Sequence, residues 1–303
     1  MRERSLRTFF MTQKIARFVL FALLLLSPTL VHAQMIGEDK IYVAQEGDTF
    51  PSIGEAHSIG FVALRAANPD IAPWELKAGK EVILPNRTIL PESAPHKGLV
   101  VNIGEMRIYD FTQSPPKYYA IGIGREAQKT PAGAYKVGAK VKNPTWRPTE
   151  RMLAEDPELK PVYPPGPDNP LGTRALYLAD SLYRIHGTNK PWGVGRRASS
   201  GCIRMYPADI EAVYDRIPTG TPVHIISEPI KVAVENGDVW LEAHPDEIMA
   251  DAYENDFVTD MKVPDGTLQM ITERAGDLRG KIDWAKVRDV LLMRPGYPVK
   301  ITS

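Results

Sequence analysis

The chain has 303 residues, of which 43% are hydrophobic and 24% are charged, and its 37 basic and 37 acidic residues balance. This is the composition of a globular protein, so it excludes a disordered chain. Only one long apolar run occurs, near the N-terminus, which excludes a protein with several membrane spans.

Residues 1–33 have the pattern of a secretory signal peptide. Five basic residues precede an apolar run over residues 18–26, and Pro28 ends this run. Val31-His32-Ala33 then offers a small-residue cleavage pattern. We expect cleavage before Gln34 and a periplasmic mature protein without an integral membrane segment; an uncleaved anchor is the alternative. Cleavage would remove five basic residues and one acidic residue, and the resulting net charge of about −4 predicts no nucleic-acid partner.

A small β-α-α-β module is predicted over residues 38–86. A strand at residues 41–43 leads to a Gly-Asp turn, and Thr49 can cap the helix that follows. A second helix fits residues 60–68, and residues 80–85 alternate as a closing strand.

This order of elements, with Gly47-Asp48-Thr49 and Ala67-Asn68-Pro69, resembles a LysM module. The resemblance implies binding of glycans that contain N-acetylglucosamine, such as peptidoglycan strands. The alternative is a packing domain without a ligand.

Residues 87–97 carry Pro91 and Pro95 between polar residues and predict a linker. A mainly-β domain, either a sandwich or an open barrel, is predicted over residues 97–228. Its expected strands cover residues 99–103, 106–111, 117–124, 133–141, 175–178, 183–186 and 221–226. One amphipathic helix begins at Pro207 and directs Ile210, Val213, Tyr214 and Ile217 to one face.

Eight prolines lie in the stretch of residues 143–172. A loop this long in a compact domain is usually functional or disordered. We expect an ordered lid over the active site, with Trp146 as its apolar anchor, and the alternative is a plain surface excursion.

The C-terminal residues 229–303 predict a mixed accessory region without a chemical motif. Residues 281–292 are expected to form a helix that directs Ile282, Ala285, Val290 and Leu291 inward. The fold class expected for the whole chain is therefore α+β and multidomain.

Cys202 is the single cysteine, so it cannot form an internal disulfide, and cysteine-ligated structural zinc is excluded. It is either a small buried hydrophobic residue or a working nucleophile. A thiol attacks carbonyl carbon as thiolate and needs a group that takes its proton, usually an imidazole. His186 ends a predicted strand, and the glycine-containing connection to Cys202 can fold back and bring the two together.

Backbone N–H groups of Gly201 and Cys202 are candidates for an oxyanion hole. Ser199 is expected to form local hydrogen bonds. The remaining histidines show no metal-ligand spacing and are expected to be surface or packing residues; they are His32, His57, His96, His224 and His244.

The motif His186-Gly187-Thr188, followed by Ser199-Ser200-Gly201-Cys202-Ile203-Arg204-Met205, resembles the signature of YkuD-type L,D-transpeptidases. Supporting matches lie at residues 121–124, 130–133, 143–146 and 164–172. A LysM-like module before the catalytic domain is also similar to periplasmic enzymes of Gram-negative bacteria.

The resemblance implies that Cys202 is the nucleophile and His186 the general base, without a cofactor or metal. Gly187, Ser200, Gly201 and Arg204 would support the loop or the oxyanion, and Arg204 would alternatively meet a substrate carboxylate. Ser200 stands where many relatives have histidine, which leaves His186 as the one histidine of the motif. Because Gly187 follows it, His186 is expected to be oriented by a backbone carbonyl.

The implied reaction is attack of Cys202 on the diaminopimelate–D-alanine bond of a peptidoglycan stem tetrapeptide, release of D-alanine, and acyl transfer to an amine. Acceptors compatible with the motif are a second diaminopimelate, which gives a 3→3 cross-link and is favoured here, the lysine of a Braun-type lipoprotein, and water. A non-catalytic peptidoglycan-binding protein is the rival of a different class.

Overall fold

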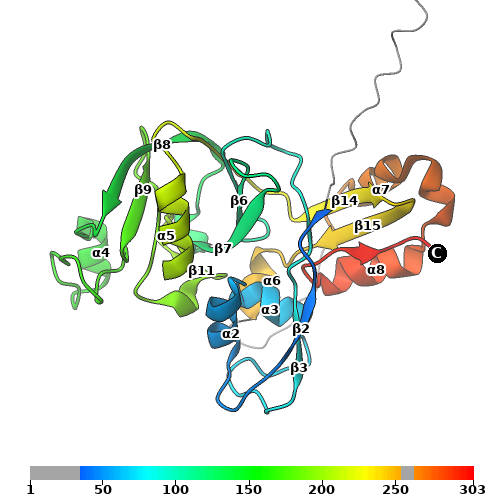
Figure 1. Cartoon of the computed structure of the whole chain (residues 1–303), viewed down its shortest axis with the longest axis horizontal. Helices are drawn as coiled ribbons and strands as arrows, with labels where there is room; N and C mark the ends of the chain where they lie inside the picture. Colours follow the sequence, from blue (N-terminus) through cyan, green and yellow to red (C-terminus); the bar gives the residue numbers. More distant parts are fainter. Residues whose placement is uncertain (1–34, 254–262) are drawn as a thin grey trace, which may run out of the picture. The chain divides into compact units, whose positions relative to one another are not determined.

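The structure, a computed structural model, describes residues 35–253 and 263–303 (Figure 1). The predicted signal peptide and its cleavage site lie outside these residues. The described residues form one compact unit. Within the described ranges, no helix is long and apolar enough to cross a membrane.

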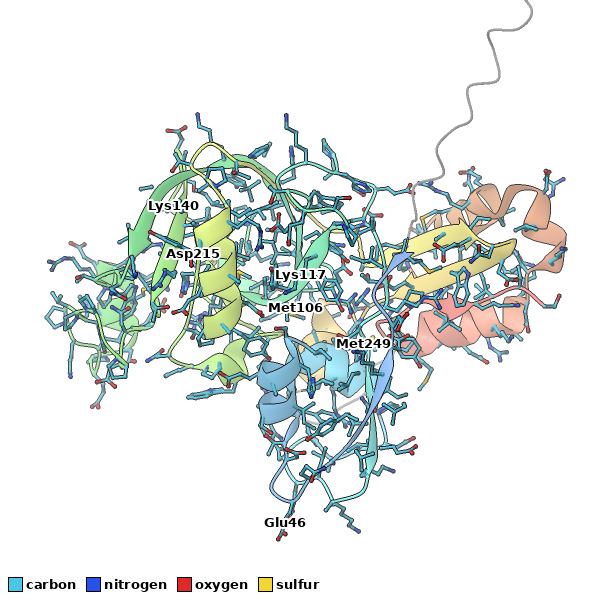
Figure 2. All side chains as sticks on the ribbon, viewed as in Figure 1. Glu46, Met106, Lys117, Lys140, Asp215 and Met249 are labelled. Atoms are coloured by element: carbon cyan, nitrogen blue, oxygen red, sulfur yellow. The ribbon has the colours of Figure 1, made fainter. Side chains whose placement is uncertain are left out.

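The N-terminal part consists of two small antiparallel strand pairs and two short helices, with β2 paired to β3 and β1 paired to β4. Its elements are β1 (Met35–Ile36), β2 (Lys40–Val43), α2 (Phe50–His57), α3 (Phe61–Ala67), β3 (Glu81–Leu84) and β4 (Thr88–Ile89). Thr49 caps α2 as predicted, in a reciprocal capping box with Ser52. The turn that carries Glu46 points into solvent at the far end of this part (Figure 2).

The segment predicted as a linker, residues 87–97, is partly built into the fold. Thr88 and Ile89 form β4, and both are buried together with Leu90. The Ile89 N–H donates to the Glu242 carboxylate at 2.6 Å. Apolar side chains and a buried acceptor therefore hold the start of this segment against the rest of the chain.

The second part contains most of the strands. Its elements are β5 (Leu99–Asn102), β6 (Arg107–Asp110), β7 (Lys117–Gly124), η1 (Glu126–Gln128), β8 (Gly133–Lys142), α4 (Glu150–Glu155), β9 (Arg174–Leu178), β10 (Arg184–His186), η2 (Pro191–Gly193), β11 (Arg197–Ser199), β12 (Ile203–Met205), α5 (Pro207–Arg216) and β13 (Pro222–Ile226).

These strands form a nine-stranded sheet in the order β11-β7-β12-β10-β9-β8-β13-β5-β6, and an additional pairing of β6 with β7 closes it into a barrel. The sequence predicted a sandwich or an open barrel; the β6–β7 hairpin supplies the closure. Helix α5 buries its own Ile210 and Val213, which belong to the main hydrophobic core together with Ile185 and Ile203 of the barrel.

The C-terminal part has its own small core around Leu241, Ile271 and Leu291. Its elements are β14 (Ile230–Glu235), β15 (Asp238–Ala243), α6 (Glu247–Ala252), α7 (Thr267–Ala275), η3 (Gly276–Lys281), α8 (Trp284–Met293) and β16 (Val299–Lys300), and β14, β15 and β16 form one antiparallel sheet.

The predicted C-terminal helix starts later than expected. Asp283 accepts hydrogen bonds from two N–H groups of the first turn, so α8 begins at Trp284. With this start, the helix buries Val287, Val290 and Leu291, whereas Ala285 is exposed, contrary to the prediction. Ile282, which immediately precedes the N-cap Asp283, is buried as expected.

A buried cluster of charges connects the barrel to the C-terminal sheet. Lys231 on β14 lies 2.7 Å from Glu105 and 3.3 Å from Glu242, and Arg107 on β6 lies 3.0 Å from Glu242. All four side chains are at most 4% exposed. Two cations thus neutralise two carboxylates whose side chains are removed from the protein surface.

We expect Lys231→Met to lower the free energy of unfolding by about 3–5 kcal/mol, because it leaves Glu105 and Glu242 buried with one cation for two charges. The matched control is Lys300→Met, whose solvent-screened ion pair with Asp238 should contribute far less to stability. Urea denaturation measures both. Equal effects of the two substitutions would contradict a buried electrostatic link.

Candidate active site

The structure places His186 and Cys202 on neighbouring strands of the barrel. His186 is the last residue of β10, and Cys202 immediately precedes β12. The two strands are parallel, with Ile185 opposite Ile203 and His186 opposite Arg204. The connection between them therefore folds back, as the glycine content predicted.

Side-chain alternation puts the chemical groups on one side of these strands. Ile185 and Ile203 are fully buried in the core, so His186 and Arg204 lie on the opposite face, and Cys202, two residues before Arg204, belongs to the same face. Electrostatics agrees with this arrangement. Burial lowers the pKa of Arg204, whereas the charge of Cys202 raises it.

His186 is held as a neutral imidazole. The residue is 4% exposed, and Nδ1 lies 2.6 Å from the Gly187 carbonyl oxygen. Because a carbonyl only accepts, Nδ1 carries the proton, and Nε2 is left with its lone pair. Burial, reinforced by the positive charge of Arg204, lowers the pKa of His186 to about 3. The expected backbone partner of His186 is confirmed.

The turn that carries Cys202 is fastened by side-chain hydrogen bonds. Ser199 Oγ donates to the Cys202 carbonyl at 2.6 Å and accepts from the Gly201 N–H at 3.1 Å. Thr130 Oγ1 donates to the Gly201 carbonyl at 3.0 Å. Gly201 has φ of +97°, and a Cβ there would lie 2.9 Å from the Tyr183 ring, so glycine is required at this position.

These bonds change the expected oxyanion site. The Gly201 N–H is engaged by Ser199, so its predicted use as an oxyanion donor does not fit this arrangement. The Cys202 N–H is left as the candidate donor. Ser200 and Arg204 are half-buried beside the cysteine, and Gly187 is buried behind His186. The local hydrogen-bonding role expected of Ser199 is confirmed.

Trp146 belongs to an ordered proline-rich loop. Its backbone N–H and carbonyl both pair with Tyr163 at 2.9 Å, and the two rings lie 5.1 Å apart. The buried Asn169 amide donates to the carbonyls of Pro144, Tyr163 and Pro164. The sequence reasoning assigned no role to Asn169 or Thr130, although both lie in the segments that carry the family resemblance.

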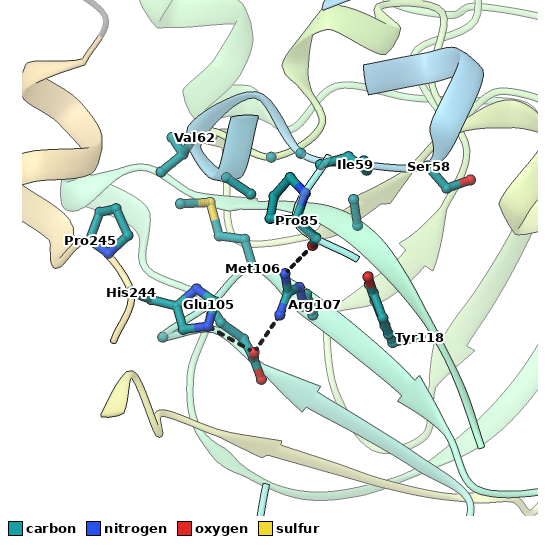
Figure 3. Close-up of a pocket in the computed structure, with 15 residues that line it drawn as sticks. Ser58, Ile59, Val62, Pro85, Glu105, Met106, Arg107, Tyr118, His244 and Pro245 are labelled. Atoms are coloured by element: carbon teal, nitrogen blue, oxygen red, sulfur yellow. Dashed lines mark hydrogen bonds and ion pairs between the residues drawn. The ribbon is translucent and has the colours of Figure 1, made fainter. Parts of the chain in front are cut away.

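A small cavity of about 20 Å³ lies away from Cys202, between residues of the N-terminal part, β6 and the end of β15 (Figure 3). It has room for about one water molecule. Glu105, Arg107 and His244 line it, and His244 faces Glu105 there.

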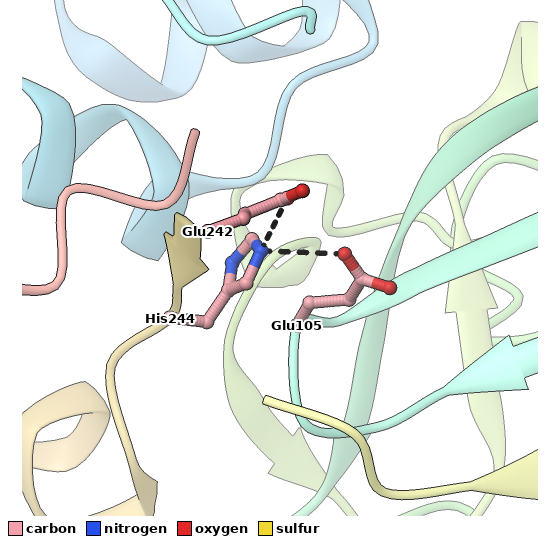
Figure 4. Close-up of side chains that lie close together, drawn as sticks. All are labelled: Glu105, Glu242 and His244. Carbon is pink, nitrogen blue, oxygen red and sulfur yellow. Dashed lines mark hydrogen bonds and ion pairs between the residues drawn. The ribbon is translucent and has the colours of Figure 1, made fainter. Parts of the chain in front are cut away.

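His244 was expected to be a surface or packing residue, but it is fully buried among charges. Its Nε2 lies 2.7 Å from Glu242 and 3.3 Å from Glu105 (Figure 4). One ligand atom from each of these three residues falls within 4.8 Å of the others, a spacing that would suit a metal ion. The carboxylates, however, are already neutralised by Lys231 and Arg107, so a divalent cation would add uncompensated charge. We therefore assign the cluster a structural role.

The neutral state of His186 predicts a pH dependence of stability. Below pH 6.5 the unfolded chain protonates this histidine, whereas the folded chain resists protonation down to about pH 3. Stability from this residue is thus complete above pH 6.5 and declines as the pH falls. Between pH 7.5 and 5.0, wild type should lose about 2 kcal/mol more unfolding free energy than His186→Asn. Urea titrations at each pH test this, and parallel curves would contradict a buried neutral imidazole.

Comparison with known proteins shows the family of the chain. The family model described as YkuD, L,D-transpeptidase catalytic domain, matches residues 96–225. The probable L,D-transpeptidase YcfS of Escherichia coli K12 is 39% identical over 224 residues, which cover 70% of each chain. The probable L,D-transpeptidase ErfK/SrfK of Salmonella typhimurium is 34% identical over 282 residues, which cover 89% of each chain. The chain belongs to the L,D-transpeptidase family.

Proposed function

We propose that this L,D-transpeptidase acts through the Cys202 sulfur, with His186 as the general base. The observation that supports the assignment most directly is the register of β10 and β12, which sets a neutral, backbone-oriented imidazole beside the turn of the only cysteine. A neutral His186 can accept a proton at Nε2, as a base must. Cys202 is half-buried, so substrate can reach it.

The proposed donor is a peptidoglycan stem tetrapeptide. Cys202 attacks the carbonyl carbon of the diaminopimelate–D-alanine bond while its proton passes to His186 Nε2. The Cys202 N–H stabilises the oxyanion, the C–N bond breaks, and D-alanine leaves with the proton from His186. A thioester on Cys202 remains. An amine then attacks the thioester, His186 takes the amine proton, and the thiol is regenerated.

The proposed acceptor is the side-chain amine of a second diaminopimelate, which gives a 3→3 cross-link. The Ser-Ser-Gly-Cys-Ile-Arg-Met form of the motif and the C-terminal extension favour it. The lysine of a Braun-type lipoprotein and water are the alternative acceptors for the same thioester. In each case Arg204 either supports the loop or meets a substrate carboxylate, and the loop of Trp146 acts as a lid that restricts water.

We further propose that the N-terminal part is a LysM-like module that binds peptidoglycan glycan strands in the periplasm, after export by the predicted signal peptide. In support, its β2-α2-α3-β3 order matches the expected one. An open groove of about 500 Å³ runs along the module between the end of α3 and β3. Ile41, Asp70 and Lys80 line it with exposed apolar and charged side chains, a mixture suited to a sugar chain.

Cys202→Ala should abolish D-alanine release from purified tetrapeptide-bearing muropeptides, because the thioester can no longer form. His186→Asn should lower the rate by roughly 10²–10⁴-fold, the usual contribution of a general base. Mass spectrometry of the products measures both effects. With a Braun-type lipoprotein added to the same assay it also identifies the acceptor, since cross-linked dimers, lipoprotein adducts and free tripeptides differ in mass.

In this assay, D-alanine release by Cys202→Ala at the wild-type rate would overturn the mechanism. Wild-type protein that binds muropeptides without ever releasing D-alanine would support the non-catalytic rival instead.

The double substitution Asp70→Ala/Lys80→Ala should weaken binding to intact sacculi, because it removes two polar side chains from the groove. Sedimentation of the protein with sacculi measures the bound fraction. Asp277→Ala/Lys286→Ala, which alters two exposed residues of the C-terminal part with the same change in charge, is the control. Equal binding by both doubles would argue against glycan recognition in this groove.

A further inference from the structure

Residues 194–199, named here the approach loop, lead from η2 through β11 to the turn of Cys202. Val194, Gly195, Arg196 and Ser199 are buried, and the Arg197 side chain is 3% exposed. The partners that bury this loop include segments outside the barrel, in both the N-terminal and the C-terminal parts.

The start of α3 is capped by the approach loop. Gly60 stands at the N-cap and offers no side-chain hydrogen bond to the first turn. The orphan N–H groups of Phe61 and Val62 donate instead to the carbonyls of Val194 and Gly195, at 3.4 and 3.2 Å. The start of α3 and the approach loop thus come into close contact at Gly60 and Gly195. A Cβ on Gly60 would lie 2.7 Å from the Gly195 Cα.

Arg196, the next residue of the approach loop, packs on aromatic rings of the N-terminal part. Its guanidinium carbon lies 3.5 Å from the centroid of the Phe61 ring and 5.2 Å from that of Trp74. The two rings stack with centroids 5.4 Å apart. A buried cation on aromatic faces is a stabilising contact, so this residue fixes the loop against α3.

The same stretch of the N-terminal part also holds the chain after Cys202. Tyr206 donates its hydroxyl to the Ile59 carbonyl at 2.9 Å, and Ser58 donates to Asp209 at 2.8 Å. Residues 58–62 therefore bind both the segment that enters the nucleophile turn and the segment that leaves it.

The C-terminal part contacts the approach loop through α6. Arg197 donates to Asp251 at 3.0 Å and lies 3.3 Å from Glu247, both on α6, and it also bonds Glu126 of the barrel at 2.6 Å. The cavity of Figure 3 marks the junction, because Ser58, Ile59 and Gly195 line it together with His244 and Pro245.

We propose that residues 58–62 and helix α6 are positioning elements that hold the approach loop, and through it Cys202, in the reactive conformation. The proposal rests on the proposed role of Cys202 as nucleophile. Neither element contacts the reacting atoms, but a misplacement of about 1 Å at a nucleophile is enough to lower a rate up to 10²-fold. Turnover should therefore depend on both accessory parts even when the substrate is a soluble tetrapeptide without glycan.

The first test is Gly60→Ala in the full chain. The backbone of Gly60 has φ of −69°, which alanine adopts freely, so the added methyl acts only by pushing against Gly195. We expect kcat for D-alanine release from a soluble tetrapeptide to fall about 10- to 100-fold with KM nearly unchanged. Gly280→Ala, whose methyl would meet no atom within 4 Å, is the matched control and should keep the wild-type kcat.

The second test removes the α6 charges with Glu247→Gln/Asp251→Asn. Both side chains are about half exposed, and the buried Arg197 keeps its bond to Glu126, so the substitutions should leave the chain folded. We expect a lower kcat, and partial rescue by Glu247→Asp/Asp251→Glu, which keeps both charges. The control is Arg274→Gln, which removes an ion pair with Glu92 elsewhere on the C-terminal part.

Circular dichroism and thermal unfolding confirm that each variant is folded at the assay temperature, and the rate of Cys202 alkylation by iodoacetamide across pH reports the environment of the thiol. A changed alkylation profile together with a lower kcat in folded variants supports the proposal. Wild-type kcat and alkylation in both the Gly60→Ala and the α6 variants, with Cys202→Ala inactive, would overturn positioning while the proposed mechanism stands. Activity of Cys202→Ala would instead overturn the mechanism itself.

Discussion

Glu105 and Glu242 are both removed from water, and a buried carboxylate is tolerated only where cations and hydrogen-bond donors surround it. Burial disfavours the charge of Glu242, but Lys231, His244 and Arg107 hold its pKa below the usual range. The compensating groups come from distant segments, since the N–H of Ile89 also donates to this carboxylate. Meeting the needs of two acids therefore fixes β4, β6 and β14 against one another.

Because of this constraint, the N-terminal and C-terminal parts are not independent of the barrel. A chain of separate modules would tolerate loss of either end, but here the polar groups of one part satisfy those of another. The carbonyls of Val194 and Gly195 accept hydrogen bonds from the first N–H groups of α3, and the carboxylates of α6 balance the charge of Arg197. The segment that carries Cys202 is thus bordered by groups that come from before and after the barrel in sequence.

The sequence predicted most of what depends on local pattern. Strands were expected at residues 117–124 and 133–141, where β7 and β8 lie, and the capping residue Thr49 located α2, because these signals act within a few residues. The predicted start of α8 was too early because Ile282 was counted as part of the apolar face of the helix. In the structure Asp283 is the N-cap, so Ile282 lies outside the helix. Ion pairs such as Lys231–Glu105 join residues far apart in sequence and leave no local period, so neither they nor the carboxylate partners of His244 could be foreseen.

The candidate active site likewise combines features that the sequence reveals with features that depend on distant neighbours. A lone cysteine and a strand-ending histidine led to the proposed chemistry, but the state of each group depends on neighbours that spacing does not reveal. Ser199 takes the N–H of Gly201 that seemed free for the oxyanion, and burial with Arg204 keeps His186 uncharged. An imidazole that resists protonation this strongly does not form a stable ion pair at rest. In the proposed mechanism, proton transfer to this imidazole is therefore favoured only as charge develops on the sulfur and the substrate, which would make the placement of the turn as important as the identity of its residues.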